Sequence, residues 1–189
     1  MSHATTHERT PTREQSLVGD ETHTTSWEVA RERLANPENQ RTNWLATVRP
    51  DGRPHLMPVI AFWIDGSFHF IAGQGTRKGR NLLADSHCVI GTGSWELPSL
   101  DVIVEGRAEP VADSDDVRRI AEIFNSNGWP LEARGDEVYG PNAPTAGLPP
   151  YRIFRMVPSK AFGLPGTYGM DQFKQEDLPR PTRWEFAAE

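Results

Sequence analysis

Apolar and polar residues alternate along much of the chain, a pattern typical of β-strands that bury one face. Within residues 100–111, for example, Val102 and Val104 alternate with Asp101 and Glu105. Runs of this kind are separated by short stretches that contain Gly, Pro, Asn or Asp, which favour turns. The sequence therefore predicts six strands, at residues 44–49, 55–64, 67–72, 88–93, 100–111 and 151–162.

Short turns connect the first three predicted strands. Pro50, Asp51 and Gly52 follow the first strand, and Asp65 with Gly66 is a two-residue hairpin signal before the third. Three consecutive antiparallel strands form a meander. Closing six mainly antiparallel strands into a barrel removes the exposed sheet edges. We therefore predict a mainly β fold: a six-stranded antiparallel β-barrel with a few peripheral helices.

Helical spacing of apolar residues predicts three short helices outside the barrel. The first contains Trp27 and Leu34, has Thr25 and Glu28 as a capping box, and stops before Pro37. The other two are predicted over residues 77–84, after Thr76, and from a Ser114 cap to the Asn127–Gly128 pair.

The two ends of the chain differ from its middle. Residues 1–25 are rich in Thr, His, Glu and Arg, and cannot bury enough surface to offset the entropy of ordering them. We expect a disordered tail over 1–25, a barrel domain over 26–163 and a C-terminal extension over 164–189. The extension and the proline-rich and glycine-rich segment 129–150 are predicted to be loops.

Composition narrows the functional classes. No run approaches the roughly 18 apolar residues of a membrane span, and the first residues lack the apolar region of a secretory signal. Cys88 is the single cysteine, which excludes an intramolecular disulfide and a multi-cysteine metal site. A net charge of −6 gives no electrostatic case for nucleic acid. We expect a cytoplasmic protein that binds no metal, nucleic acid or membrane.

Residues 75–82 are the most informative segment for chemistry. Gly75, Thr76, Arg77 and Lys78 come directly after an apolar strand and open the second predicted helix. Backbone N–H groups at a helix start favour an anion, and a hydroxyl with nearby cations strengthens that preference. The pattern predicts a phosphate site at Thr76 and Lys78. The alternative is a capped helix whose basic side chains face water.

Three segments within the predicted barrel match known sequence motifs. Residues 46–55 read ATVRPDGRPH, residues 68–78 read FHFIAGQGTRK, and residues 104–108 read VEGRA. In order and spacing they resemble the pyridoxamine 5'-phosphate oxidase family of FMN-binding split barrels. The resemblance extends over residues 27–163. Within the wider family, the chain looks most similar to flavin-dependent and F420-dependent oxidoreductases.

The resemblance implies a cofactor site built by two strands and the start of a helix. Thr76, Arg77 and Lys78 fall on the triplet that binds the flavin phosphate. Asn81 lies one helical turn after Arg77, where it would add an amide contact. The segment that lines the isoalloxazine ring corresponds to Met57, Pro58, Val59 and Ile60, and Ile71 and Ala72 fall beside the ribityl chain.

Two positions depart from the oxidase pattern, which has Arg where Met57 stands and Lys where Phe62 stands. The oxidase's substrate-binding residues near the C-terminus are not recognisable either, so we do not expect a true pyridoxamine 5'-phosphate oxidase. The resemblance implies an oxidoreductase that transfers a hydride between its cofactor and an unidentified small organic substrate. Because the cofactor carries this chemistry, no catalytic side chain is expected.

The resemblance implies FMN as the first choice of cofactor. F420 is the alternative, because Arg77, Lys78 and Arg80 suit its longer anionic tail equally well. The alternative function is a non-catalytic carrier or sensor of flavin or haem with the same fold. Haem would need an axial ligand such as His55 or His69.

Two residues outside the cofactor motifs are candidates for substrate contact. His55 would donate to the substrate or the cofactor, and the alternative is a structural or surface histidine. Trp184 would cover the cofactor or a subunit surface, and the alternative is an anchor for the C-terminal segment. The strand 55–64 is apolar on both faces, whereas a small barrel buries only one. We therefore expect a homodimer with the cofactor at the subunit interface.

Overall fold

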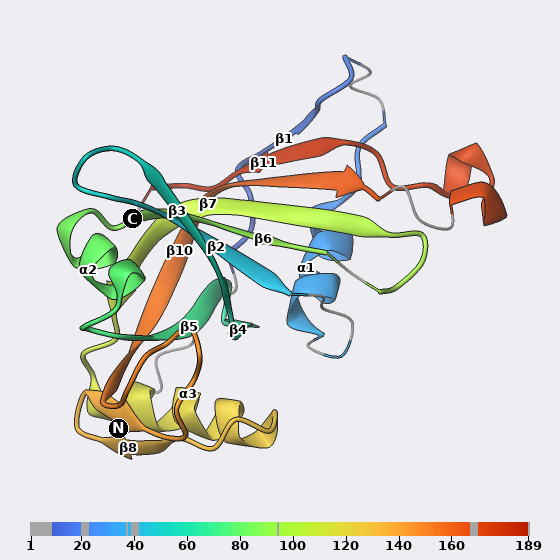
Figure 1. Cartoon of the computed structure of the whole chain (residues 1–189). Helices are drawn as coiled ribbons and strands as arrows, with labels where there is room; N and C mark the ends of the chain where they lie inside the picture. The colour runs from blue at the N-terminus through green and yellow to red at the C-terminus, as the bar shows by residue number, and fades with distance from the viewer. Residues whose placement is uncertain are drawn as a thin grey trace.

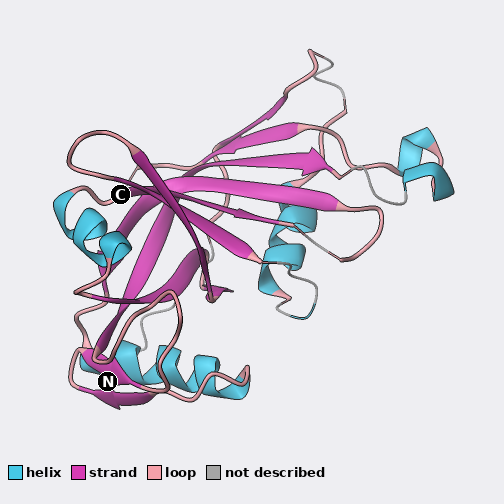
Figure 2. Ribbon diagram, viewed as in Figure 1, coloured by secondary structure: helices cyan, strands magenta, loops and turns pink. Residues whose placement is uncertain are grey.

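A computed structural model describes residues 9–19, 23–36, 38, 42–93, 95–166 and 170–188. They form an antiparallel β-sheet accompanied by three α-helices (Figures 1 and 2). The strands are β1 (Arg13–Ser16), β2 (Asn43–Val48), β3 (Pro54–Val59), β4 (Ala61–Ile64), β5 (Ser67–Gly73), β6 (His87–Thr92), β7 (Leu100–Pro110), β8 (Glu132–Arg134), β9 (Glu137–Tyr139), β10 (Tyr151–Pro165) and β11 (Thr182–Glu185). The helices are α1 (Trp27–Ala35), α2 (Arg77–Ala84) and α3 (Ser114–Ser126), and two 3-10 turns span Met170–Gln172 and Gln175–Asp177. None of the described helices is long and apolar enough to cross a bilayer.

The sheet curls around its longest strand, β10. Hydrogen-bonded neighbours follow the order β1-β11-β10-β7-β6-β2-β3, and β5 joins β10 to β4. Residues 151–156 of β10 pair with β5 on one side, and residues 154–165 pair with β7 on the other. The sheet is not closed, because β3 and β4 follow each other in the chain without pairing. Asn43 Nδ2 donates to the carbonyl oxygen of Ala61 at 3.1 Å across this split.

The structure confirms the mainly antiparallel split barrel, but it corrects the number and limits of the strands. The predicted strand 55–64 is interrupted at Ile60, so that β3 pairs with β2 and β4 pairs with β5. Because the pairing strand changes at Ile60, one continuous apolar stretch contributes a strand to two different parts of the sheet. The predicted loop 129–150 contains the β8–β9 hairpin, whose turn places Gly135 at a φ of 66°.

Two apolar clusters fill the fold. The first occupies the barrel interior and includes an aromatic end, by which we mean Trp27, Trp63, Phe68, Trp184 and Phe186. The second lies between α3 and the outer face of β5, where Ile71 meets Phe124 and Val138. In Figure 1, α1 and α3 accordingly lie at different ends of the sheet.

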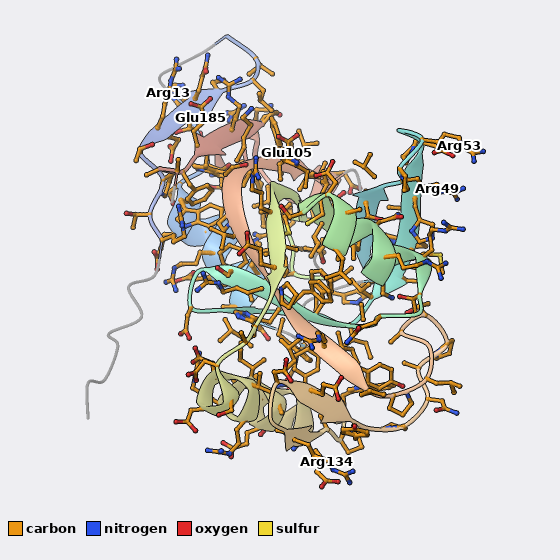
Figure 3. The ribbon with its side chains drawn as sticks, turned by 90° about the vertical axis from the view of Figure 1, so that its left-hand side faces the viewer. Arg13, Arg49, Arg53, Glu105, Arg134 and Glu185 are labelled. Carbon is orange, nitrogen blue, oxygen red and sulfur yellow. The ribbon has the colours of Figure 1, made fainter. Side chains whose placement is uncertain are left out.

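Both ends of the chain contribute strands, which corrects the prediction of a disordered tail over 1–25 and a loop over 164–189. β1 pairs with β11, and β11 pairs with β10. Figure 3 shows Arg13 and Glu185 at this edge, and their Cα atoms are partners in the register. Backbone pairing at an edge does not require apolar side chains, so the polar sequence of β1 gave no strand signal. Residues 1–8 and 20–22 of the predicted tail lie outside the described residues.

Two predicted helix caps also need correction. Ser26 precedes α1 without a side-chain cap, and the Thr25 hydroxyl instead exchanges hydrogen bonds with the backbone of Arg180. Helix α3 is capped by Asp113 rather than Ser114. The Asp113 carboxylate accepts from the backbone N–H groups of Asp115 and Asp116 at 3.0 Å each. A carboxylate suits this position because it also opposes the positive end of the helix dipole.

Candidate functional site

The start of α2 forms a tight turn, which we call the helix-start turn (residues 73–79). The Thr76 side chain caps the helix: its Oγ1 accepts from the N–H of Gly79 at 3.1 Å and donates to the carbonyl oxygen of Gly73 at 2.7 Å. A Cβ atom on Gly79 would lie 2.4 Å from that same carbonyl oxygen, so the turn needs glycine there. Thr76 is half-buried, and its hydroxyl shapes the turn.

Lys78 points into the protein rather than into solvent. Only 2% of its surface is exposed, and its Nζ donates to the carbonyl oxygen of Thr145 at 2.6 Å. Burial lowers the pKa of Lys78 from 10.5 to about 8, and no nearby acid opposes the shift. At neutral pH the side chain is therefore mostly a buried ammonium whose hydrogen-bond partner is neutral. Such a group favours an anionic ligand.

Further cations surround the helix-start turn. Burial is the main cause that lowers the pKa of His55, and the charges of Arg49, Arg77 and Lys78 lower it further. Figure 3 shows Arg49 with Arg53 at the tip of the β2–β3 hairpin. The local potential is thus positive, although the whole chain carries a net charge of −6.

An apolar cavity of about 590 Å³ lies on the other side of the segment that contacts Lys78. The predicted ring-lining residues Pro58, Val59 and Ile60 line it, whereas Met57 lies just before them on β3. Thr145 also lines the cavity, so one residue joins it to the buried ammonium. The remaining lining residues are Thr42, Asn43, Ala61, Phe62, Trp129, Ala143 and Pro144.

A chain of polar side chains connects α2 with β2 and β3. Asn81 is buried, and its Nδ2 donates to Thr47 Oγ1 at 2.9 Å. Thr47 Oγ1 in turn lies 3.5 Å from His55 Nδ1. Asn81 Oδ1 is buried and has no hydrogen-bond partner among the described residues. The predicted cofactor contact of Asn81 therefore has an available acceptor atom but no open surface.

Three predicted site residues lie away from the cavity. Ile71 packs in the cluster beneath α3, and Ala72 faces the barrel interior. Trp184 is fully buried in the aromatic end, 5.4 Å from Trp27 between ring centroids. A fully buried ring cannot contact a substrate in this structure. We therefore correct the substrate prediction for Trp184 to its alternative, an anchor for the C-terminal segment.

The residues that sequence reasoning missed come mainly from the segment 129–150. It was predicted to be a loop, and Trp129, Pro144 and Thr145 were not among the predicted site residues. Proline and glycine in this stretch signalled a loop without indicating where it docks. Together, the apolar cavity and the buried ammonium fit a flat apolar ring that carries an anionic group.

Comparisons with known proteins give the chain a family. A pyridoxine/pyridoxamine 5'-phosphate oxidase from Gluconobacter oxydans is 27% identical over 66% of this chain and 70% of its own length. An F420 reductase structure has a TM-score of 0.50 at 23% identity, covering 69% of this chain and 94% of its own. An FAD-binding protein from Mesorhizobium loti reaches 0.53 at 16% identity, covering 88% and 97%. The sequence model of the pyridoxamine 5'-phosphate oxidase family matches residues 29–162, so the chain belongs to this family.

Proposed function

We propose that this protein is a flavin-dependent or deazaflavin-dependent oxidoreductase that transfers a hydride between its cofactor and a small organic substrate. The observation that carries the proposal is the position of Thr145, which lines the apolar cavity while its carbonyl oxygen lies 2.6 Å from Lys78 Nζ. A flavin nucleotide joins a flat ring to an anionic phosphate, so it needs both environments side by side. Membership of an oxidase family supports the same class of function.

The chain's own residues bind, orient and shield the cofactor. Pro58, Val59 and Ile60 form an apolar wall that orients one ring face and excludes water. The Lys78 ammonium holds the anionic end. A bound flavin or deazaflavin supplies the hydride chemistry. None of the described residues that line the cavity is titratable.

We propose FMN as the cofactor, with F420 as the alternative. A single buried ammonium at Lys78 suits a compact phosphate group. The exposed guanidinium of Arg77 and those at the tip of the β2–β3 hairpin would instead accommodate a longer anionic tail. The departures at Met57 and Phe62 leave uncharged side chains where the oxidase pattern has cations. We therefore retain the prediction that the substrate is not pyridoxamine 5'-phosphate.

We also propose a homodimer that uses the outer face of β2 and β3. Trp44 and Leu56 are 46% and 57% exposed, and both project from this face together with Val48. Their strands pair directly, so the exposed side chains form one apolar surface. A second copy of the same surface would bury it. Leu56→Asp should halve the mass measured by light scattering, whereas Val18→Asp on another exposed site should leave it unchanged.

The function is tested by titrating ligand-free protein with FMN and with F420 while following fluorescence, together with the visible spectrum of the purified protein. We expect micromolar or tighter binding of one cofactor. Bleaching of a yellow protein by NADH or NADPH would support an FMN enzyme. Selective binding of F420 would support the deazaflavin alternative. A haem spectrum, or failure to bind either nucleotide, would contradict the oxidoreductase proposal.

A further inference from the structure

The loop formed by residues 143–147 stands between the two halves of the proposed site. On one side, Ala143, Pro144 and Thr145 line the apolar cavity. On the other side, the carbonyl oxygen of Ala146 accepts from the N–H of Gly73 at 2.9 Å, and that of Thr145 accepts from Lys78. The loop therefore touches both the ring environment and the helix-start turn.

Ala143 and Ala146 pack in the second apolar cluster, but few other hydrogen bonds among the described residues hold this loop. The N–H groups of Ala146 and Gly147 both donate to the carbonyl oxygen of Ala143 at 3.1 Å, which closes the loop on itself. The Tyr151 hydroxyl donates to the carbonyl oxygen of Gly147 at 2.9 Å and secures its far end. At Thr145, among the described residues, the hydrogen bond from a side chain to the loop is the one that Lys78 Nζ donates to the Thr145 carbonyl oxygen.

The contact between Lys78 and Thr145 leaves no opening for a ligand. Lys78 is buried, so an anion cannot reach its Nζ while the loop and the side chain keep this arrangement. The ammonium has a neutral carbonyl oxygen as its partner, and a phosphate is a stronger partner for a cation. Anion binding and the Lys78–Thr145 bond therefore compete for the same group.

We infer that Lys78 latches the 143–147 loop in the ligand-free protein, and that a ligand must carry an anionic group to release it. The inference rests on the proposed function, and it adds a requirement on the ligand. A flavin nucleotide would open the latch, whereas riboflavin, which has the same ring without the phosphate, would not. The site would thus discriminate between cofactors by their anionic group, because that group must displace the Thr145 carbonyl oxygen from Lys78 before the loop can close over the ring.

Hydrogen exchange at the backbone amides of Gly73, Ala146 and Gly147 tests the latch. Inorganic phosphate, which is too small to cover the loop, should speed exchange at these amides by about tenfold or more, the value of a lost charge-assisted bond. FMN should release the same latch, and riboflavin at equal occupancy should not. Exchange that stays unchanged or slows when phosphate is added would overturn the inference.

Two variants sharpen this test. Lys78→Met keeps the length of the side chain without its charge, and should give fast exchange in the absence of ligand and no response to phosphate. Lys174→Met, which makes the same substitution at an exposed lysine outside the site, is the matched control and should behave as the unmodified protein does. Unchanged exchange in Lys78→Met would contradict the latch.

A third variant serves if Lys78→Met does not fold. Gly147 has a φ of +82°, and a Cβ atom there would lie 2.8 Å from the Thr76 methyl group. Gly147→Ala should therefore push the loop outward and speed exchange with Lys78 intact. FMN binding, measured separately by ultrafiltration, distinguishes the two proposals. Bound FMN without loop release refutes only the latch, whereas failure to bind both FMN and F420 refutes the proposed function.

Discussion

The aromatic end and the helix-start turn bury large side chains in opposite ways. At the aromatic end, Trp27 packs edge-on against Trp63, Trp184 and Phe186 at centroid distances of 5.0–5.8 Å. At the helix-start turn, Lys78 is at least as buried as Trp27 but holds a charge against a neutral carbonyl oxygen. Packing at the aromatic end stabilises the fold directly. The helix-start turn instead keeps a buried ammonium that an anionic ligand can pair with.

Unpaired polar atoms alone do not separate the two regions. The indole N–H groups of Trp27 and Trp63 also lack hydrogen-bond partners among the described residues. These groups are neutral, however, and an unpaired neutral group costs far less than an unpaired buried charge. The comparison therefore teaches that a buried charge without a counter-ion is the better indicator of a binding site.

The largest expected effect is on stability, at the aromatic end. Trp184→Ala should lower the free energy of unfolding by about 3–5 kcal/mol, because it leaves a large cavity in the core. The packing is tight: a Cβ atom on Gly163 would lie 2.5 Å from the Trp184 ring. Urea unfolding measures the loss. Trp95→Ala, at a tryptophan that is 63% exposed, is the control and should change stability little.

Cofactor affinity of the folded Trp184→Ala protein should stay close to that of the unmodified chain. A large drop in affinity at a temperature where the variant is folded would show that the aromatic end also serves the ligand site. That result would remove the separation of the two regions.

A smaller effect is expected from acid at a third buried group. His69 is buried on β5, and desolvation lowers its pKa from 6.5 to about 4. Between these values the unfolded chain binds a proton that the folded chain does not, so stability falls as the pH drops from 6.5 to 4. The loss is about 3 kcal/mol at most. His69→Gln should flatten this part of the stability profile, and an unchanged slope would assign the acid sensitivity to other groups.

The smallest effect in free energy is the most specific for function. Lys78→Met should weaken FMN binding by about 1.5–3 kcal/mol through loss of a charge-assisted bond. Stability at pH 7 should be unchanged or higher, because an apolar side chain replaces a buried charge. Isothermal titration and urea unfolding measure the two quantities. Equal losses of affinity in Lys78→Met and Lys174→Met would indicate a general effect of charge.

Regular alternation made much of the barrel predictable. The strand 100–111 corresponds to β7 because each of its faces has one environment along its length. The break at Ile60 was not predictable, because residues 56–64 are all apolar and such a run does not show where the pairing strand changes. β1 was missed because an edge strand held by backbone hydrogen bonds and by Glu14, whose Oε2 accepts from Trp184 Nε1 at 3.1 Å, needs no apolar pattern.

The candidate site was predictable where local chemistry determines it. The helix over residues 77–84 follows from the residues next to it in sequence, and the structure confirms it as α2. The inward direction of Lys78 was not predictable, because its partner is a backbone carbonyl 67 residues away, which no side-chain pattern reveals. The role of the 143–147 loop in the cavity wall was not predictable either, because the loop reaches Lys78 through a backbone carbonyl oxygen.

A crystal structure of the protein with FMN bound tests the central claim most directly. The account predicts that the ring lies against Pro58, Val59 and Ile60, with a phosphate oxygen within hydrogen-bond distance of Lys78 Nζ. A bound FMN whose phosphate lies elsewhere, with Lys78 still donating to the Thr145 carbonyl oxygen, would contradict it.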